Sequence, residues 1–166
     1  MNSNLIKDIV YGLIVAVFLA IQSSNLIAIG GVFPDLMMIL IVAHSFYFGE
    51  FKGEIFGFSM GVLVDAMSGT LFGLNAFVYT FLAWFTTIYK RYILVSDIVA
   101  FVLYIFIATI IKYIFYVFFH WAFLGIGLLD GAFFLRLGGE ILYNLIIAAL
   151  LFFLTPFLYK REDKPF

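Results

Sequence analysis

Few ionisable residues of this chain fall inside its apolar segments, and these few could do chemistry. Asp65 follows Gly53, Gly57 and Gly61 at the same four-residue spacing. Residues four apart share one face of a helix, so these glycines let another backbone approach closely and place Asp65 on the same crowded face. A carboxylate at such a seam is costly in hydrocarbon and marks a candidate helix-packing or partner interface. Tight packing around a capping or snorkelling Asp65 is the structural alternative.

A second set of charged residues is expected on the same side of the membrane as Asp65. Lys112 lies inside an apolar run, where an unpaired ammonium costs roughly 2.5–3.5 kcal/mol, so Asp65 or Glu140 is expected to pair with it. Arg136 and Glu140 are four apart on one helix and can pair with each other. With Asp35, these five residues form the predicted outer polar cluster, which is either a pocket or a polar seam between helices. The alternatives are snorkelling of Lys112 and a first-turn role for Asp35.

The other polar side chains in the apolar segments indicate structural roles. His44 and His120 are isolated, the chain has no cysteine, and it contains no nucleophile elbow, no HExxH motif and no lysine-bearing phosphate loop. We therefore expect no enzymatic activity, no metal and no cofactor. Asn75 is expected to cap a helix, and Asn144 to form hydrogen bonds between helices.

The composition indicates the environment in which this chain folds. Hydrophobic residues make up 66% and charged residues 11% of the 166 residues, and the mean hydropathy is +1.18. Soluble domains have roughly 45–50% apolar and 25% charged residues, so an integral membrane protein is expected. The length suits one transmembrane helical domain over residues 1–166. The net charge of -1 argues against a nucleic-acid partner.

The chain contains six apolar runs that approach the roughly 20 residues needed to cross a bilayer. They cover residues 9–29, 34–48, 54–67, 74–89, 97–120 and 135–159. An earlier polar exit from the first run, at Gln22, Ser23, Ser24 and Asn25, is the alternative. The second run is short, and Pro34 suits the first turn of its helix. The sequence therefore predicts an all-α polytopic membrane protein, built as a bundle of six transmembrane helices.

The cationic residues predict the orientation of this bundle. One side receives Lys7, Lys52, Lys90, Arg91, Lys160, Arg161 and Lys164, and the opposite side receives only Arg136. Cytoplasmic loops are enriched in Lys and Arg, so both termini are expected in the cytoplasm. The loop 121–134 then lies on the outer side. It is too apolar to face water, so we expect it in the membrane interface or against another protein.

The middle of the chain carries an ordered set of motifs. They read Pro34-Asp35-Leu36, Gly49, Gly53, Gly57-Phe58-x-x-Gly61-x-x-x-Asp65-x-x-Ser68-Gly69-x-x-x-Gly73-Leu74-Asn75-Ala76. This series resembles the signature of the MreD family of rod shape-determining membrane proteins. The resemblance implies a non-enzymatic component of the bacterial inner membrane that partners MreC and works with MreB, RodA, RodZ and a class B transpeptidase in peptidoglycan synthesis. No matching motif covers Lys112, Arg136 or Glu140.

A second reading follows from the similar fold of the substrate-binding subunits of energy-coupling-factor vitamin transporters. In that reading the outer polar cluster lines a vitamin pocket, although the outer loops offer few polar groups to orient a ligand. In the first reading the glycine face and the apolar outer loop bind partner helices, and membrane lipid covers the rest. The scaffold function is our main expectation, and the transporter subunit is the alternative.

Overall fold

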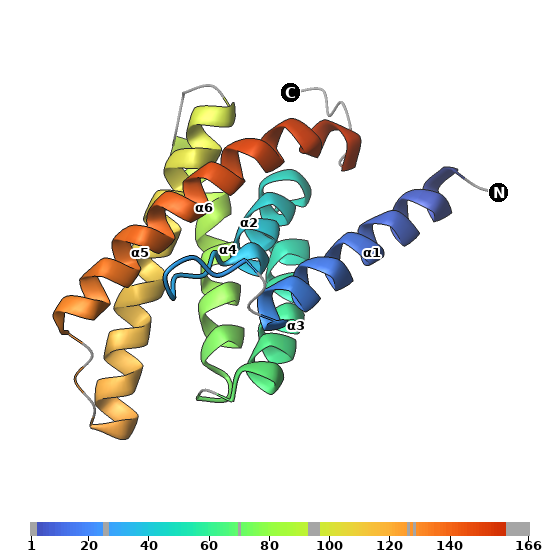
Figure 1. The fold of residues 1–166 in the computed structure, drawn as a ribbon. Coiled ribbons are helices and arrows are strands. Elements are labelled where there is room, and N and C mark those ends of the chain that lie inside the picture. Colours follow the sequence, from blue (N-terminus) through green and yellow to red (C-terminus); the bar gives the residue numbers. More distant parts are fainter. Residues whose placement is uncertain are drawn as a thin grey trace.

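The computed structural model describes residues 3–24, 27–69, 71–92, 97–125, 127 and 129–158, and the regular structure in these ranges is helical. It comprises six helices, α1 (Ser3–Ser24), α2 (Leu36–Phe48), α3 (Glu50–Ser68), α4 (Leu74–Tyr92), α5 (Asp97–Leu124) and α6 (Gly131–Leu158) (Figure 1). The prediction of an all-helical fold is confirmed. Within the described residues, the stretches Ile98–Leu124 and Gly131–Phe153 are long and apolar enough to cross a membrane. The six-span bundle stays a prediction.

The helices differ from the predicted runs mainly at the glycines. α1 ends at Ser24 and not near residue 29. Gly30 and Gly31 take positive φ angles of 59° and 80° and form a turn closed by a bridge between Ile29 and Val32. α5 continues to Leu124, where Gly125 (φ 65°) ends it. α6 begins at Gly131, so the predicted outer loop 121–134 is largely helical.

Successive helices from α2 to α6 run in alternating directions. In Figure 1 the α3–α4 and α5–α6 connections lie at the lower end of the molecule, and the α2–α3 connection lies at the upper end. The described part of α1 begins, and that of α6 ends, on the upper side. This arrangement is the one that the predicted orientation requires. The tail cations Lys160, Arg161 and Lys164 lie outside the described residues, so the membrane sidedness stays a prediction.

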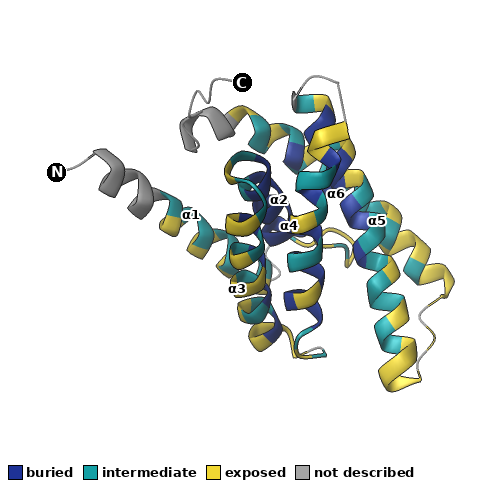
Figure 2. Ribbon diagram, turned by 180° about the vertical axis from the view of Figure 1, so that it is seen from behind, coloured by how far each residue is buried: buried dark blue, intermediate teal, exposed yellow. Residues whose placement is uncertain are grey.

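α2 forms the centre of the fold. Its residues from Leu36 to Ala43 are all buried, and α1, α3, α4, α5 and α6 each contact it (Figure 2). With 13 residues, the helix is about 20 Å long, which is shorter than the roughly 30 Å hydrocarbon core of a bilayer. The extended segment before it packs on α6, where Val32 lies against Gly139 and the Ile27 carbonyl accepts a hydrogen bond from Tyr143.

The glycine row of α3 is used inside the protein. A Cβ atom at Gly61 would lie 2.6 Å from Ala76 N, and one at Gly57 would lie 2.8 Å from the Tyr79 carbonyl oxygen, so α4 approaches α3 with backbone against backbone. Gly53 faces α2, where a Cβ atom would meet the Ser45 side chain and, at 2.9 Å, its Cα atom. The glycines of α3 therefore have the predicted helix-packing role, and their packing partners are helices of this chain. The partner-interface role assigned to this face is wrong, because α2 and α4 already cover it.

Candidate functional site

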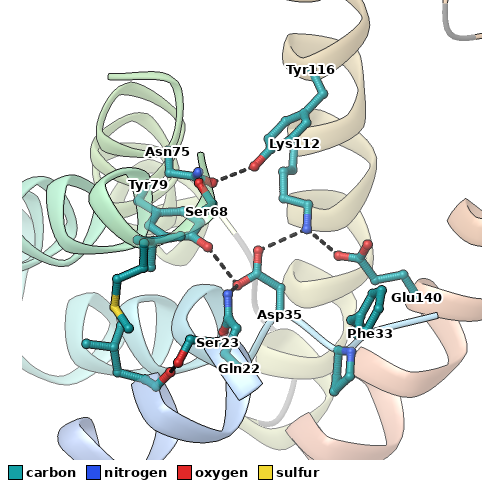
Figure 3. A pocket seen from close by; sticks show the side chains of 14 residues that line it. Gln22, Ser23, Phe33, Asp35, Ser68, Asn75, Tyr79, Lys112, Tyr116 and Glu140 are labelled. Atoms are coloured by element: carbon teal, nitrogen blue, oxygen red, sulfur yellow. Dashed lines mark hydrogen bonds and ion pairs between the residues drawn. The ribbon is translucent and has the colours of Figure 1, made fainter. Parts of the chain in front are cut away.

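A cavity of about 470 Å³ lies where α1, α3, α4, α5 and α6 surround the start of α2 (Figure 3). Its polar lining includes Gln22, Asp35, Tyr79, Lys112, Tyr116 and Glu140, and its apolar lining includes Leu19, Val64 and Met67. Three members of the predicted outer polar cluster therefore line one cavity. It is the largest concentration of charge inside the described protein.

Lys112 of α5 lies between the two carboxylates of this cavity. Its ammonium donates to Asp35 Oδ2 at 2.9 Å and to Glu140 Oε1, and both contacts are ion pairs. The three side chains are 9%, 5% and 10% exposed in the order Lys112, Asp35 and Glu140. Glu140 is one of the two partners that the sequence indicated. The other, Asp65, forms no ion pair with Lys112 among the described residues, and Asp35 takes its place because the start of α2 lies beside the middle of α5.

Asp35 also caps α2. Its Oδ1 accepts hydrogen bonds from Met38 N at 2.9 Å and from Tyr79 OH at 2.8 Å, and its own backbone N–H donates to Asn144 Oδ1 at 2.8 Å. A carboxylate at the N-terminus of a helix satisfies free N–H groups and lies at the positive end of the helix dipole. Asp35 therefore combines the first-turn role, held as the alternative, with the predicted membership of the outer polar cluster.

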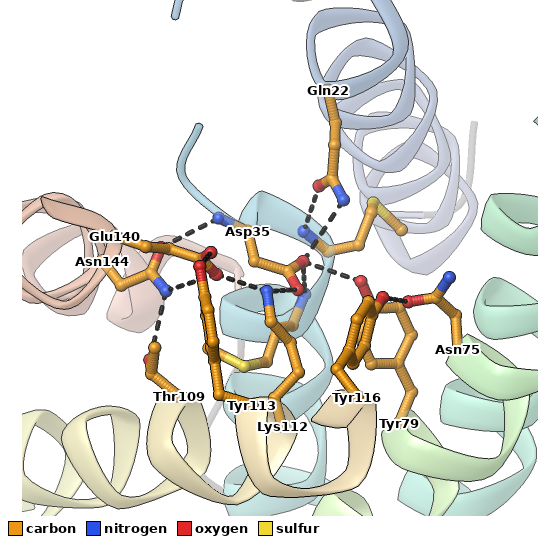
Figure 4. A network of polar contacts seen from close by, with 12 residues as sticks. Gln22, Asp35, Asn75, Tyr79, Thr109, Lys112, Tyr113, Tyr116, Glu140 and Asn144 are labelled. Atoms are coloured by element: carbon orange, nitrogen blue, oxygen red, sulfur yellow. Dashed lines mark hydrogen bonds and ion pairs between the residues drawn. The ribbon is translucent and has the colours of Figure 1, made fainter. Parts of the chain in front are cut away.

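A chain of hydrogen bonds extends from the ion pairs across α5 and α6 (Figure 4). Glu140 Oε2 accepts a bond from Tyr113 OH at 2.7 Å. Asn144, one turn further along α6, donates to Thr109 Oγ1 at 3.1 Å, so it joins the two helices as expected. Polar side chains in a buried network hold their helices in one register, because each shift leaves a donor or acceptor without a partner.

Asp65 lies apart from the ion pairs and caps α4. Its two carboxylate oxygens accept bonds from the backbone N–H groups of Gly73, Asn75 and Ala76, each at 3.0 Å, and from the Asn75 side chain at 2.8 Å. The capping role expected of Asn75 thus belongs to Asp65, on the preceding helix. Asn75 instead accepts a bond from Tyr116 OH at 2.5 Å, and this contact connects the cap to the cavity.

Arg136 does not belong to the buried cluster. Its side chain is exposed, and the described residues form no ion pair between it and Glu140. The predicted pairing of these two residues is wrong because Glu140 is turned inward, toward Lys112.

The tyrosines of this site were not predicted from the sequence. Tyr113 and Tyr116 fit an interfacial belt by position, but their hydroxyl groups bind Glu140 and Asn75 inside the protein. Thr109, Lys112, Tyr113 and Tyr116 follow the i, i+3, i+4, i+7 spacing of one helix face. That spacing around a lysine in an apolar run is the signal that could have identified a polar face.

Replacing Asp65 with asparagine tests the cap. The amide keeps the shape of the carboxylate but replaces one acceptor oxygen with a donor, which leaves backbone N–H groups of α4 without a partner. A buried donor without a partner costs about 1–3 kcal/mol, so we expect a clearly lower temperature of thermal unfolding in detergent. Asp130→Asn is the control, because Asp130 is exposed and caps α6 through Phe133 N, a role that asparagine also fills. Equal effects of the two substitutions would contradict the assigned role of Asp65.

Within the described residues, no group of three or more His, Cys, Asp and Glu side chains is placed to hold a metal ion. The polar groups of the cavity instead suit binding or helix registration. Comparison of the chain with protein-family models, with curated proteins and with solved structures found no match.

Proposed function

We propose that this protein is a non-enzymatic adaptor of the cell-wall elongation machinery in the bacterial inner membrane. It maintains rod cell shape by binding MreC, and through it the elongation proteins MreB, RodA, RodZ and a class B transpeptidase. It crosses the membrane several times, with both termini in the cytoplasm. The proposal rests on the ordered motifs from Pro34 to Ala76 that resemble the MreD family.

The observation that carries this proposal is the structural use of those motif residues. Gly57 and Gly61 let α4 approach α3, Asp65 caps α4, and Asn75 binds Tyr116 of α5. A motif whose members are used in packing and capping specifies a fold and not a reaction. A family with such a motif is suited to an adaptor function, in which one helix arrangement presents surfaces to other proteins.

The partner surface proposed here is the end of the α5–α6 pair. The glycine face is covered, whereas Trp121, Phe123, Leu129 and Phe134 at this end are 60% to 70% exposed. An apolar cavity of about 460 Å³ lies between the two helices beside them, lined by residues such as Ile114, Phe118 and Leu137. Large exposed aromatic side chains around a cavity are typical of protein interfaces. We propose that an apolar segment of MreC binds there.

Co-purification tests this function and this surface together. The protein is purified from native membranes in mild detergent, and its companions are identified by mass spectrometry, with MreC expected among them. The double variant Trp121→Ser, Phe134→Ser should reduce co-purified MreC about tenfold or more, because truncating an interface hot spot costs about 2 kcal/mol or more. The matched control is Phe51→Ser, Phe58→Ser, which removes two exposed aromatic side chains from α3.

The adaptor function and the binding surface at the α5–α6 end can be contradicted independently of each other. Absence of MreC and all elongation proteins from the wild-type sample would overturn the adaptor function. MreC that co-purifies equally with both double variants would keep the function but exclude the α5–α6 end as its binding surface.

The charged cavity favours one other function, that of a substrate-binding subunit of an energy-coupling-factor vitamin transporter. Such a subunit needs a cavity for a small molecule, and the cavity beside Lys112 has suitable size and polarity. In this case the same purification would recover an ATPase module and no MreC.

A further inference from the structure

The charged cavity contains more negative than positive charge. Asp35 and Glu140 are both ion-paired to Lys112, so two carboxylates share one ammonium. The residues that line the cavity include no other charged side chain. Arg136, the nearest cation along α6, is exposed and forms no ion pair with Glu140 among the described residues. The site is therefore one positive charge short of balance when its groups have their ordinary charges.

The missing charge belongs at Glu140 and not at Asp35. Asp35 caps α2, so the N-terminal N–H groups and the dipole of that helix offset part of its charge. Glu140 lies in the interior of α6 and caps no helix, and its donors other than Lys112 are neutral, namely Tyr113 OH and the Asn144 side-chain amide. An incoming cation would therefore gain most beside Glu140.

The cavity also offers a donor that the protein does not use. The Lys112 ammonium has three hydrogens, and it donates to Asp35 and Glu140. The remaining N–H has no acceptor among the described residues, although Lys112 is only 7% exposed and lines the cavity (Figure 3). A ligand oxygen could accept this bond.

We infer that this cavity binds a small organic ammonium compound that carries an oxygen atom close to its nitrogen. The ammonium binds Glu140, the oxygen accepts from Lys112, and any attached alkyl chain contacts Leu19, Val64 and Met67. Such a group occurs both in soluble amino alcohols and in the ethanolamine headgroup of membrane lipids. The inference rests on the cavity alone and does not depend on the adaptor function, which the co-purification of MreC tests separately.

Titration of the full chain in detergent with ethanolamine tests the inference. We expect saturable binding by calorimetry and a rise in the temperature of thermal unfolding. Glycolate, an anion of similar size, should give neither effect, and sodium chloride at the same concentration should not replace ethanolamine. Glu140→Gln keeps the side-chain shape and should weaken binding about 10-fold to 100-fold, because the ammonium loses its charged acceptor and only a neutral amide oxygen remains. Asp130→Asn, outside the cavity, should bind as the wild type does.

A second experiment, with lipids, distinguishes a lipid headgroup from a soluble compound as the source of the ammonium group. The wild-type protein is placed in nanodiscs of phosphatidylglycerol alone or of phosphatidylglycerol with phosphatidylethanolamine. Stabilisation by phosphatidylethanolamine that Glu140→Gln abolishes would support the inference and identify a lipid headgroup as the ligand. The inference is overturned if neither ethanolamine nor phosphatidylethanolamine binds, if glycolate or sodium acts equally well, or if folded Glu140→Gln binds as tightly as the wild type. The first two of these results need no variant, so a folding defect of Glu140→Gln cannot hide them.

Discussion

Replacing Gly61 with leucine is expected to prevent the α3–α4 pair from packing. A Cβ atom at this position would lie 2.6 Å from Ala76 N and 2.7 Å from the Asn75 carbonyl carbon, and both atoms belong to the backbone of α4. Backbone atoms of a packed helix cannot move aside as the tip of a flexible side chain can. The whole start of α4 must shift, which also separates its N–H groups from Asp65.

The expected size of this effect combines two terms. Overpacking a buried site costs about 1–3 kcal/mol, and loss of a helix cap costs about 1 kcal/mol more. We expect little folded protein after size-exclusion chromatography in detergent and a much lower unfolding temperature for what remains. Gly138→Leu is the matched control, because Gly138 also lies in a helix and a Cβ atom there meets nothing within 4 Å. A stable Gly61→Leu protein would show that α3 and α4 are not in backbone contact.

Replacing Lys112 with methionine should destabilise the protein even more strongly. The substitution keeps an apolar side chain of similar length but leaves Asp35 and Glu140 buried without their cation. Breaking a buried ion pair by removing one partner costs about 3–5 kcal/mol. The unfolding temperature in detergent should fall sharply, whereas Lys52→Met, at an exposed position of α3, should change it little.

A second substitution separates the charge effect from a loss of packing. Glu140→Gln in the Lys112→Met background removes one of the two uncompensated charges, so it should restore part of the lost stability. Failure of this rescue would mean that Lys112 acts through the packing of its alkyl chain. An effect of Lys112→Met no larger than that of Lys52→Met would mean that the ammonium reaches water, as in the snorkelling alternative.

The number and type of helices could be predicted from the sequence because apolar length and periodicity are local properties. The residues at which the helices end were harder to predict. α5 passes the expected end at His120 because Trp121 to Leu124 contain no residue that breaks a helix, and Gly125 is the first to take a positive φ. The first run was extended to residue 29, past the end of α1, because residues 26–29 are as apolar as those of α1.

The contacts between helices could be predicted only in part. Depth in the membrane indicated Glu140 as a partner of Lys112, but depth alone cannot show which helices are neighbours. Asp35 is 77 residues from Lys112 along the chain, and only the central position of α2 brings them together. The glycine spacing correctly predicted close packing of α3. It carried no information on whether the opposing backbone belongs to this chain or to another one.

The central position of α2 has a consequence for the order in which the protein is made. Asp35 is completed early in synthesis, but its partners Lys112 and Asn144 follow 77 and 109 residues later. In the proposed membrane setting, α2 cannot reach its final place until α5 and α6 have been inserted. Until then Asp35 can bind Gln22 and Tyr79 but has no cation beside it. Assembly therefore ends when the last two helices close around a helix that was synthesised second.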